Sequence, residues 1–297
     1  MSSEAQPIET EFESFKTQVR TLRDRHWPRP EGAENVREIF HYCDASGLHG
    51  IISTQSLWAS DIFSLNDASE VEYARQITSE ALRSYPYLRP IAEQLFDQEG
   101  SFMDYYRDFN TYVGCFSAGN DLLSQWRAYG AAGHGFAVGF NYELLKQQAD
   151  GPPPRFSVFP VVYSRDQQLS ALHGFMSETA HIIGLSYPLP SKQFAEIGLA
   201  ILFLMPPLKN PVFSDEREWR MVLVDPEEPE FELCFRPIRG AIKPYVKVPL
   251  KPECFTRVVQ GPTSHKGLGE RFLRRLLQKY GLGHVAVESS EIPLRSL

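Results

Sequence analysis

The sequence predicts an α+β fold with a mixed, mainly antiparallel central sheet and helical insertions. Two observations predict it. Strand patterns gather in clusters and helical patterns in clusters of their own, whereas strict alternation of the two is typical of a parallel α/β sheet. From residue 219 to residue 260, short strand patterns follow one another with only proline, glycine and charged turns between them.

An amphipathic pattern predicts a separate N-terminal helix over residues 8–25, before the proline-containing linker WPRPEGAEN. Its apolar residues recur every three to four positions: Phe12, Phe15, Val19 and Leu22. We therefore expect an N-terminal helix and linker over residues 1–37 and a single α+β domain over residues 38–297. Residues 165–205 read as two helices broken near Pro188 and Pro190, and we expect them to form a helical insertion in that domain.

The first half of the main domain mixes both element types. Strands are expected at Glu38 to Tyr42 and Ser56 to Ser60, with a helix between them that Asp44 or Ser46 caps. Residues 65–70 read as a turn with Ser69 or Asp67 as a helix cap, followed by two or three helices over residues 70–110. A ligand role for Asn66, Asp67 and Glu70 is the less favoured alternative, because Asn, Asp and Ser are the usual caps.

Strands dominate the second half of the chain, which ends with one clear helix. The helix spans Leu268 to Lys279, and a last strand follows at His284 to Val287. The preceding strands are expected at Phe156 to Tyr163, Trp219 to Val224, Phe231 to Phe235, Tyr245 to Val248 and Thr256 to Gln260.

Composition and charge narrow the class of protein. The chain has 297 residues, 42% of them hydrophobic and 23% charged, which suits a globular protein with a sizeable core. The net charge of −7 argues against a general nucleic-acid binder. The N-terminus lacks the apolar core of a signal peptide, and the longest apolar run, Ile197 to Met205, is too short to span a bilayer. The four cysteines form no CxxC, so we expect reduced thiols, a cytoplasmic location and no membrane partner.

The stretch from Cys115 to Phe140 reads as strand, turn, short helix, glycine break and second strand. The helix is expected from Asp121 to Tyr129, and the glycines around it allow a ligand to come close. It concentrates donors and aromatic rings within two turns: Ser124, Gln125, Trp126, Arg127 and Tyr129. We expect this helix to form one wall of a ligand pocket.

A pair of glutamates opens the strand that begins near Trp219. Side chains two apart lie on one face of a strand, so Glu216, Glu218 and Arg220 should project together. Neighbouring carboxylates repel unless a cation or a ligand hydroxyl shares them, which makes such pairs frequent in functional sites. The alternative, at least equally favoured by the sequence alone, is an exposed acidic edge strand with an internal ion pair to Arg220.

Other candidate sites carry weaker signals. His41 and Tyr42 could bond and stack on a ligand, although a histidine at a strand end is more often structural. The loop Gly261 to Gly267 precedes a helix and could hold a phosphate, but it lacks P-loop spacing. His173 and His181 lack metal-ligand spacing, and no metal is expected. The sequence contains none of the hydrolase, metalloprotease, calcium-loop and dinucleotide motifs GxSxG, HExxH, DxDxDG and GxGxxG.

Several separated segments identify the chain as resembling the bacterial domain-of-unknown-function family two-nine-seven-one. The resemblance covers roughly residues 38–295 and by itself implies no activity. The segments are His41-Tyr42 with GLHGIISTQSLWAS, FSLNDASE, CFSAGNDLLSQWRAYGAAGHGFAVGF, Val162-Tyr163, FSDEREWRMV, FTRVVQGP and SSEIPLR.

A more distant resemblance is to the ADP-ribosyltransferase fold. Those enzymes place a His or Arg on the first strand, a Ser or Tyr on a middle strand, and a Glu, often the second of an E-x-E pair, on a late strand. The order in this chain is His41, then Ser117 or Tyr129, then Glu218 with Glu216 before it. The chain departs from that family in the middle element, which has no Ser-Thr-Ser.

The resemblance implies a role for each residue toward NAD as the substrate. Glu218 would bind the ribose and favour loss of nicotinamide, Glu216 would orient the acceptor nucleophile, and His41 would bond to a ribose. The other residues would bind the dinucleotide. Trp126, Tyr129 or Tyr42 would stack on a ring of the dinucleotide. Arg127 would bind the pyrophosphate. Further binding contacts would come from Ser117, Gln125 and Arg220.

Three functions follow as expectations. The first is an NAD-using enzyme of ADP-ribosyltransferase type or an NAD-cleaving enzyme, with a role in bacterial defence or toxin activity and a protein or nucleic-acid acceptor. The second is a non-catalytic nucleotide- or nucleic-acid-sensing module, and the third is an interaction scaffold. The first requires Glu218, His41 and the helix from Gln125 to Tyr129 to line one cleft.

Overall fold

The computed structural model describes residues 5–64, 69–98, 110–150, 156–184, 189–224, 226, 231–238, 240–262 and 268–293. The chain divides into two compact units, each built from three separate segments. The helical unit contains Met1–Pro30, Asp67–Phe109 and Val161–Val212. The sheet unit contains Glu31–Asn66, Asn110–Pro160 and Phe213–Leu297.

This division differs from the expected boundaries at residues 1–37 and 38–297. The expected helical insertion near residues 165–205 groups with the N-terminal helix. Whether either unit folds alone is untested, so the domain assignment stays a prediction.

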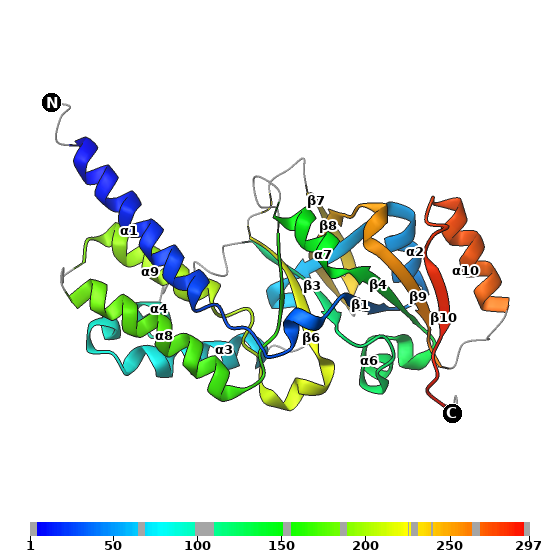
Figure 1. Ribbon diagram of the computed structural model, residues 1–297, viewed down its shortest axis with the longest axis horizontal. Helices are drawn as coiled ribbons and strands as arrows, with labels where there is room; N and C mark the ends of the chain where they lie inside the picture. Colours follow the sequence, from blue (N-terminus) through cyan, green and yellow to red (C-terminus); the bar gives the residue numbers. More distant parts are fainter. Residues whose placement is uncertain are drawn as a thin grey trace. The chain divides into compact units, whose positions relative to one another are not determined.

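The helical unit packs its helices around one apolar core (Figure 1). The i, i+4, i+7 spacing of Phe15, Val19 and Leu22 on α1 buries all three side chains, as the sequence predicted. The break between α8 and α9 also lies where expected, before Ser191. Its described helices are α1 (Ala5–Arg25), α3 (Ser69–Arg83), α4 (Arg89–Phe96), α8 (Arg165–Gly184) and α9 (Ser191–Phe203).

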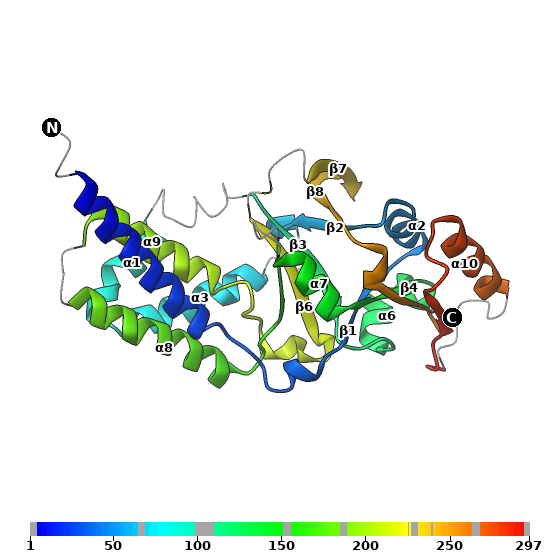
Figure 2. The ribbon, with the colours of Figure 1, turned by 45° about the horizontal axis from the view of Figure 1, so that its top comes forward.

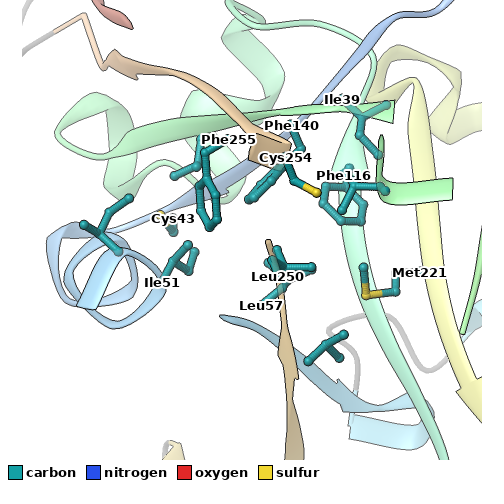
Figure 3. Close-up of a cluster of buried hydrophobic side chains, with 14 of the residues drawn as sticks. Ile39, Cys43, Ile51, Leu57, Phe116, Phe140, Met221, Leu250, Cys254 and Phe255 are labelled. Atoms are coloured by element: carbon teal, nitrogen blue, oxygen red, sulfur yellow. The ribbon is translucent and has the colours of Figure 1, made fainter. Parts of the chain in front are cut away.

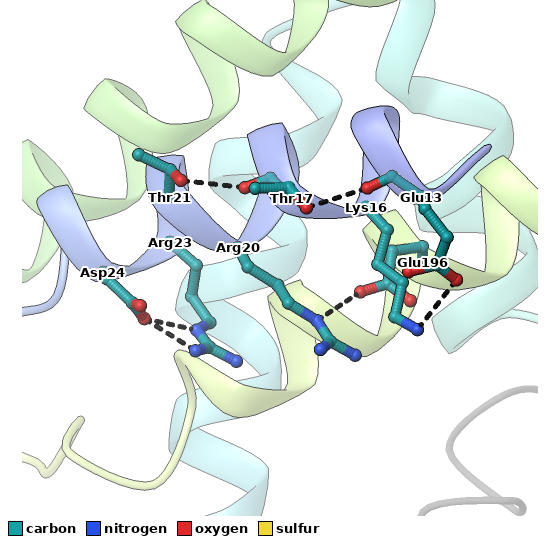
Figure 4. Close-up of polar contacts among 8 residues, drawn as sticks. All are labelled: Glu13, Lys16, Thr17, Arg20, Thr21, Arg23, Asp24 and Glu196. Carbon is teal, nitrogen blue, oxygen red and sulfur yellow. Dashed lines mark hydrogen bonds and ion pairs between the residues drawn. The ribbon is translucent and has the colours of Figure 1, made fainter. Parts of the chain in front are cut away.

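The polar face of α1 carries ion pairs rather than a free charged stripe (Figure 4). Arg20 donates from Nε to Glu196 of α9 at 3.0 Å, and Arg23 reaches Asp24 at 2.6 Å. Arg23 also lies over the ring of Phe203, 5.5 Å from its centroid. Exposed pairs of this kind each contribute about 0–1 kcal/mol, so the buried apolar face dominates the docking of α1.

The sheet unit is built on a ten-stranded mixed sheet that is antiparallel except between β9 and β10 (Figures 1 and 2). Its main path runs β10-β9-β4-β1-β3-β2-β8-β7, and β6 pairs with both β3 and β5. The predicted α+β class with a mainly antiparallel sheet is confirmed. The strands are β1 (Glu38–Cys43), β2 (Ser56–Asp61), β3 (Thr111–Ser117), β4 (Phe136–Asn141), β5 (Ser157–Pro160), β6 (Glu218–Val224), β7 (Glu232–Ile238), β8 (Ala241–Pro249), β9 (Phe255–Gln260) and β10 (Ala286–Ser289).

Strand β3 pairs with other strands along both edges, but the two edges are paired over different lengths. One edge pairs with β6 along its whole length, from Thr111 to Ser117. The other edge pairs with β1 at Ser117 and with β2 at Tyr112 and Val113, so β1 and β2 diverge along it. Helix α2 (Ala45–Thr54) connects the two diverging strands. The predicted cap holds, because Asp44 accepts a hydrogen bond from the amide of Gly47 at 2.7 Å.

Apolar side chains from α2, both diverging strands and β3 fill the core of the sheet unit (Figure 3). Leu57 and Phe140 are fully buried, and the Phe140 ring lies edge-on to Phe116, with ring centroids 5.7 Å apart. The remaining helices of the unit are α6 (Leu123–Ala128), α7 (Tyr142–Ala149) and α10 (Leu268–Lys279).

Some elements differ from the sequence expectations. Helix α7, capped by Asn141, was not predicted, and β5 is shorter than the strand expected up to Tyr163. Helix α3 is described from Ser69 onward, and its capping contacts lie outside the described residues. The alternative cap Asp67, with Asn66, lies outside the described residues, as does the loop of residues 263–267. Among the described residues, no helix combines the length and apolar character of a membrane span.

Candidate functional site

The glutamate–arginine pair at the start of β6 is buried. Arg220 donates from Nε and Nη2 to the two carboxylate oxygens of Glu218, at 2.8 and 3.0 Å. The two residues are 5% and 3% exposed. The predicted internal ion pair is therefore present. The expected exposed edge strand is wrong, because β6 lies between β3 and β5 and carries Glu218 inside the protein.

Glu216 does not share the strand face of Glu218. It ends a 3-10 helix, Pro211–Glu216, and Arg217 then adopts a left-handed conformation with φ of 45°. This turn breaks the two-residue alternation before β6 begins, so the predicted side-by-side arrangement of the glutamates is wrong. The Glu216 carboxylate instead accepts a hydrogen bond from the Tyr129 hydroxyl at 3.3 Å.

Ser117, at the end of β3, fastens this turn to the sheet. Its hydroxyl donates to the backbone carbonyl of Glu216 at 2.7 Å and accepts from the amide of Gly119 at 3.2 Å. In the β3–β6 register Ser117 lies opposite Glu218. Ser117 is buried, so it positions the backbone that carries Glu216.

His41 links β1 to β3 by a side-chain hydrogen bond, next to the point where the two strands pair. Its Nδ1 lies 2.8 Å from the carbonyl oxygen of Cys115 on β3. A carbonyl only accepts, so Nδ1 carries the proton and the neutral ring keeps an acceptor at Nε2. Burial lowers the pKa of His41, the bond to Cys115 opposes this shift, and the positive charge of Arg236 adds to it.

Tyr42 and Trp126 pack inside the protein. Trp126 is fully buried, and its ring lies edge-on to Tyr42 with centroids 4.8 Å apart. The Tyr42 hydroxyl donates to the carbonyl of Gly119 at 2.8 Å and accepts from the amide of Leu122 at 3.1 Å. Burial raises the pKa of Tyr42. This arrangement gives the expected ring-stacking role of these two residues no support.

Asp121 gathers three donors and was not singled out in the sequence. One carboxylate oxygen accepts from the Trp126 indole and from the Ser290 hydroxyl, both at 2.6 Å, and the other accepts from the Glu291 amide at 2.8 Å. The only hint in the sequence was that the segments around Asp121 and Ser290 both belonged to the family resemblance. The pairing itself joins positions 169 residues apart, which no local pattern predicts.

Helix α6 divides the remaining predicted residues between its two sides. Gln125 is buried beside Trp126, whereas Arg127 and Tyr129 are exposed. The backbone carbonyl of Gln125 accepts from the amides of Tyr129 and Gly130 and ends the helix. A ligand can therefore reach Arg127 and Tyr129 directly, but not Gln125 or Trp126.

Hydrogen bonds in the sheet unit link residues that neighbour the three predicted segments. Tyr129 joins α6 to Glu216, Ser117 joins β3 to the same turn, and Tyr42 joins β1 to the loop before α6. A cleft lined jointly by Glu218, His41 and α6 stays a prediction. A cavity of about 260 Å³ lies in the helical unit, and none of the predicted site residues lines it. Its lining residues are Arg20, Arg23, Glu196, Leu199, Ala200 and Phe203.

The cysteines do not supply a nucleophile in the core. All four lie within the described residues and form no disulfide. Burial raises the pKa of the Cys43 thiol to about 12 and that of Cys254 to about 11, so both stay protonated at neutral pH. Within the part of the chain that the structure describes, no group of three His, Cys, Asp or Glu side chains could hold a metal ion.

Comparison with known proteins bears on the family alone. No curated protein and no solved structure matches the chain. The resemblance to ADP-ribosyltransferases is therefore not supported by any match. Residues 125–221, which run from Gln125 on α6 to the Glu218–Arg220 pair on β6, match the model of the family described as "Protein of unknown function (DUF2971)", so the predicted resemblance to that family is confirmed over these residues.

Proposed function

We propose that the sheet unit is an NAD-using enzyme that transfers ADP-ribose to an acceptor or hydrolyses NAD, with its site at the junction of β3, β6 and α6. One observation carries the proposal. Tyr129, which caps α6, donates to the Glu216 carboxylate, while Ser117 binds the backbone carbonyl of Glu216 and lies opposite Glu218 in the β3–β6 register. Carboxylates at such a junction suit a reaction that develops positive charge on a sugar.

In the proposed reaction the bond between C1′ of the ribose and the nicotinamide nitrogen breaks, and its electron pair leaves with nicotinamide. The carboxylate of Glu218 stabilises the oxocarbenium-like ribose. Glu216, oriented by Tyr129, takes the proton of the water or acceptor group that attacks C1′. The Nε2 atom of His41 accepts a hydrogen bond from a ribose hydroxyl. The exposed Arg127 binds the pyrophosphate.

The proposal requires the ligand to reach Glu218, which is 5% exposed and ion-paired in this structure. Arg220 offers a route, because guanidinium binds phosphate as well as carboxylate. When Arg220 turns to the pyrophosphate, Glu218 is left to face the ribose. Catalysis then depends on an exchange of partners within β6.

The test is nicotinamide release from NAD by the purified chain, with chromatography to detect the product. We expect release that Glu218→Gln abolishes and Glu216→Gln slows. Glu13→Gln is the matched control, because it removes an exposed carboxylate that pairs with Lys16 in α1. Intact NAD after long incubation, with or without protein and nucleic-acid acceptors, would contradict the enzymatic proposal.

The second candidate function is a non-catalytic nucleotide-sensing module. It is favoured by the same burial of Glu218, since the ion pair with Arg220 is complete without a ligand. A thermal-shift screen with nucleotides separates the two functions. Stabilisation that survives Glu218→Gln without turnover supports sensing, whereas turnover lost in that variant supports the enzyme.

A further inference from the structure

The hairpin of β7 and β8 ends the sheet with an exposed apolar face. Phe235 is 63% exposed, Ile242 75% and Leu233 41%. Strand alternation puts Leu233 and Phe235 on one face, and the pairing of Pro237 with Ile242 puts Ile242 on that face too. Contiguous exposed apolar side chains on a sheet edge mark an interaction surface.

Two prolines fix which backbone groups of β7 point outward. Phe235 lies opposite Pro244, and Pro237 opposite Ile242. Proline has no N–H, so these must be the non-hydrogen-bonded pairs of the hairpin. Leu233 and Phe235 therefore direct their N–H and C=O groups away from β8. Among the described residues β7 is the last strand on this side of the sheet, and no described strand pairs with its outer edge (Figure 2).

The opposite face of β7 is charged and anchored. Arg236 donates to the Ser60 hydroxyl at 2.8 Å and lies over the Tyr245 ring, 5.6 Å from its centroid. Glu232 pairs with Lys247 at 2.9 Å and stays mostly exposed. The hairpin is thus held to β2 from one face, which leaves its apolar face and outer edge for a partner.

The sequence of β7 is complementary to itself. It reads Glu232-Leu233-Cys234-Phe235-Arg236. When β7 pairs antiparallel with the same strand of a second copy, centred on Cys234, Glu232 faces Arg236 and Leu233 faces Phe235. The Leu233–Phe235 pairs are then hydrogen-bonded pairs, because both residues direct their backbone groups outward. This register therefore sets opposite charges against each other, apolar side chains against each other, and outward-pointing backbone donors against acceptors.

We propose that the chain forms a two-fold symmetric dimer in which β7 pairs with β7 of a second copy to make one continuous sheet. Such an interface is isologous, so each contact occurs twice. Pro237 ends the pairing because it offers no N–H. One short strand pair with a small apolar face buries less than a standard interface, so we expect a dimer that dissociates on dilution.

Sedimentation velocity over a range of protein concentrations tests the proposal. We expect the mass to rise from that of the monomer to twice that value. Phe235→Asp should abolish this rise, and Phe272→Asp, on α10 and also exposed at 56%, should leave it unchanged. A monomer at every concentration overturns the proposal, and so does a dimer that survives Phe235→Asp. A peptide strand from another protein would then be the occupant of the edge.

Charge reversal tests the register. Glu232→Arg should weaken the dimer at least tenfold, because it sets like charges opposite each other across the two-fold axis. Adding Arg236→Glu to Glu232→Arg should restore association, because the pair is then reversed in both copies. Circular dichroism of each variant shows that the fold is retained. Failure of the double substitution to restore association, in a folded variant, contradicts the register.

Cys234 provides a covalent test of the same geometry. Facing residues of a non-hydrogen-bonded antiparallel pair have Cα atoms about 4.5 Å apart, within the range that a disulfide spans. A mild added oxidant, which takes up the electrons and protons of the two thiols, should link the dimer. Cys234→Ser should prevent the link, whereas Cys115→Ser, a variant of another half-buried cysteine, should not. An unchanged yield in Cys234→Ser overturns the proposed axis.

Discussion

Two carboxylates of the sheet unit are held in opposite ways. Glu218 pairs with Arg220, a cation two residues further along its own strand. Asp121 is held by uncharged donors, from Trp126 in the following helix and from Ser290 and Glu291 near the C-terminus. The first contact is local and joins no segments, so its partner can change without unfolding. The second ties distant segments together, so its loss loosens the fold.

The largest expected effect comes from breaking the local pair. Arg220→Met leaves the Glu218 carboxylate buried without its cation, which should cost about 3–5 kcal/mol in the free energy of unfolding. Urea denaturation measures it, with Arg274→Met as the control, since Arg274 pairs with Glu270 on the exposed surface of α10. Adding Glu218→Leu to Arg220→Met should recover most of the loss. A cost below about 1 kcal/mol in the single variant would show that the pair is dispensable.

Breaking the Asp121 network should have a smaller but wider effect. Asp121→Ala leaves the buried indole N–H of Trp126 without its acceptor and should cost about 2 kcal/mol. It should also speed proteolysis near Ser290, because that segment loses its hydrogen bonds to Asp121. Limited proteolysis with mass spectrometry measures the second effect, and Asp24→Ala, at an exposed pair, serves as the control. Unchanged cleavage near Ser290 would show that Asp121 does not hold the C-terminal segment in place.

His41 should make the stability of the folded chain depend on pH. Its pKa is lowered in the folded state, so the unfolded chain binds the proton more readily. Stability is therefore complete above about pH 6.5, the ordinary pKa of histidine, and falls as the pH drops below it. Thermal unfolding between pH 7.5 and 5.5 measures the fall, which should be smaller in His41→Gln. An equal fall in both proteins would assign the acid sensitivity to other groups.

The smallest effect on stability is expected at Tyr129. Tyr129→Phe removes one long hydrogen bond to Glu216 at a partly exposed position, and should change the free energy of unfolding by less than about 0.5 kcal/mol. Under the proposed function it should still slow nicotinamide release, because Glu216 loses its orientation. Parallel denaturation and activity measurements separate the two effects. A stability loss as large as that of Asp121→Ala would mean that Tyr129 is structural.

The sequence predicted most elements because their periodicity is local. Helix α10 begins at Leu268 and ends at Lys279, as its pattern indicated, and α8 and α9 break near the predicted prolines. The site was predicted less well, because its geometry depends on one backbone angle and on pairing between distant strands. The positive φ of Arg217 takes Glu216 off the strand, and no residue type in that segment signals it. The burial of Glu218 follows from the strands on both sides of β6, which local patterns do not reveal.

The interleaving of the two units has a consequence for synthesis on the ribosome. Ser117 binds the backbone of Glu216, which is 99 residues further along the chain. The last segment of the helical unit, Val161–Val212, lies between these two residues. During translation β3 therefore emerges long before the strand that covers its edge. Until β6 follows, that edge offers unpaired amides and carbonyls to any neighbouring chain. We expect the nascent protein to depend on cellular factors that shield such an edge, in a way that the finished protein does not.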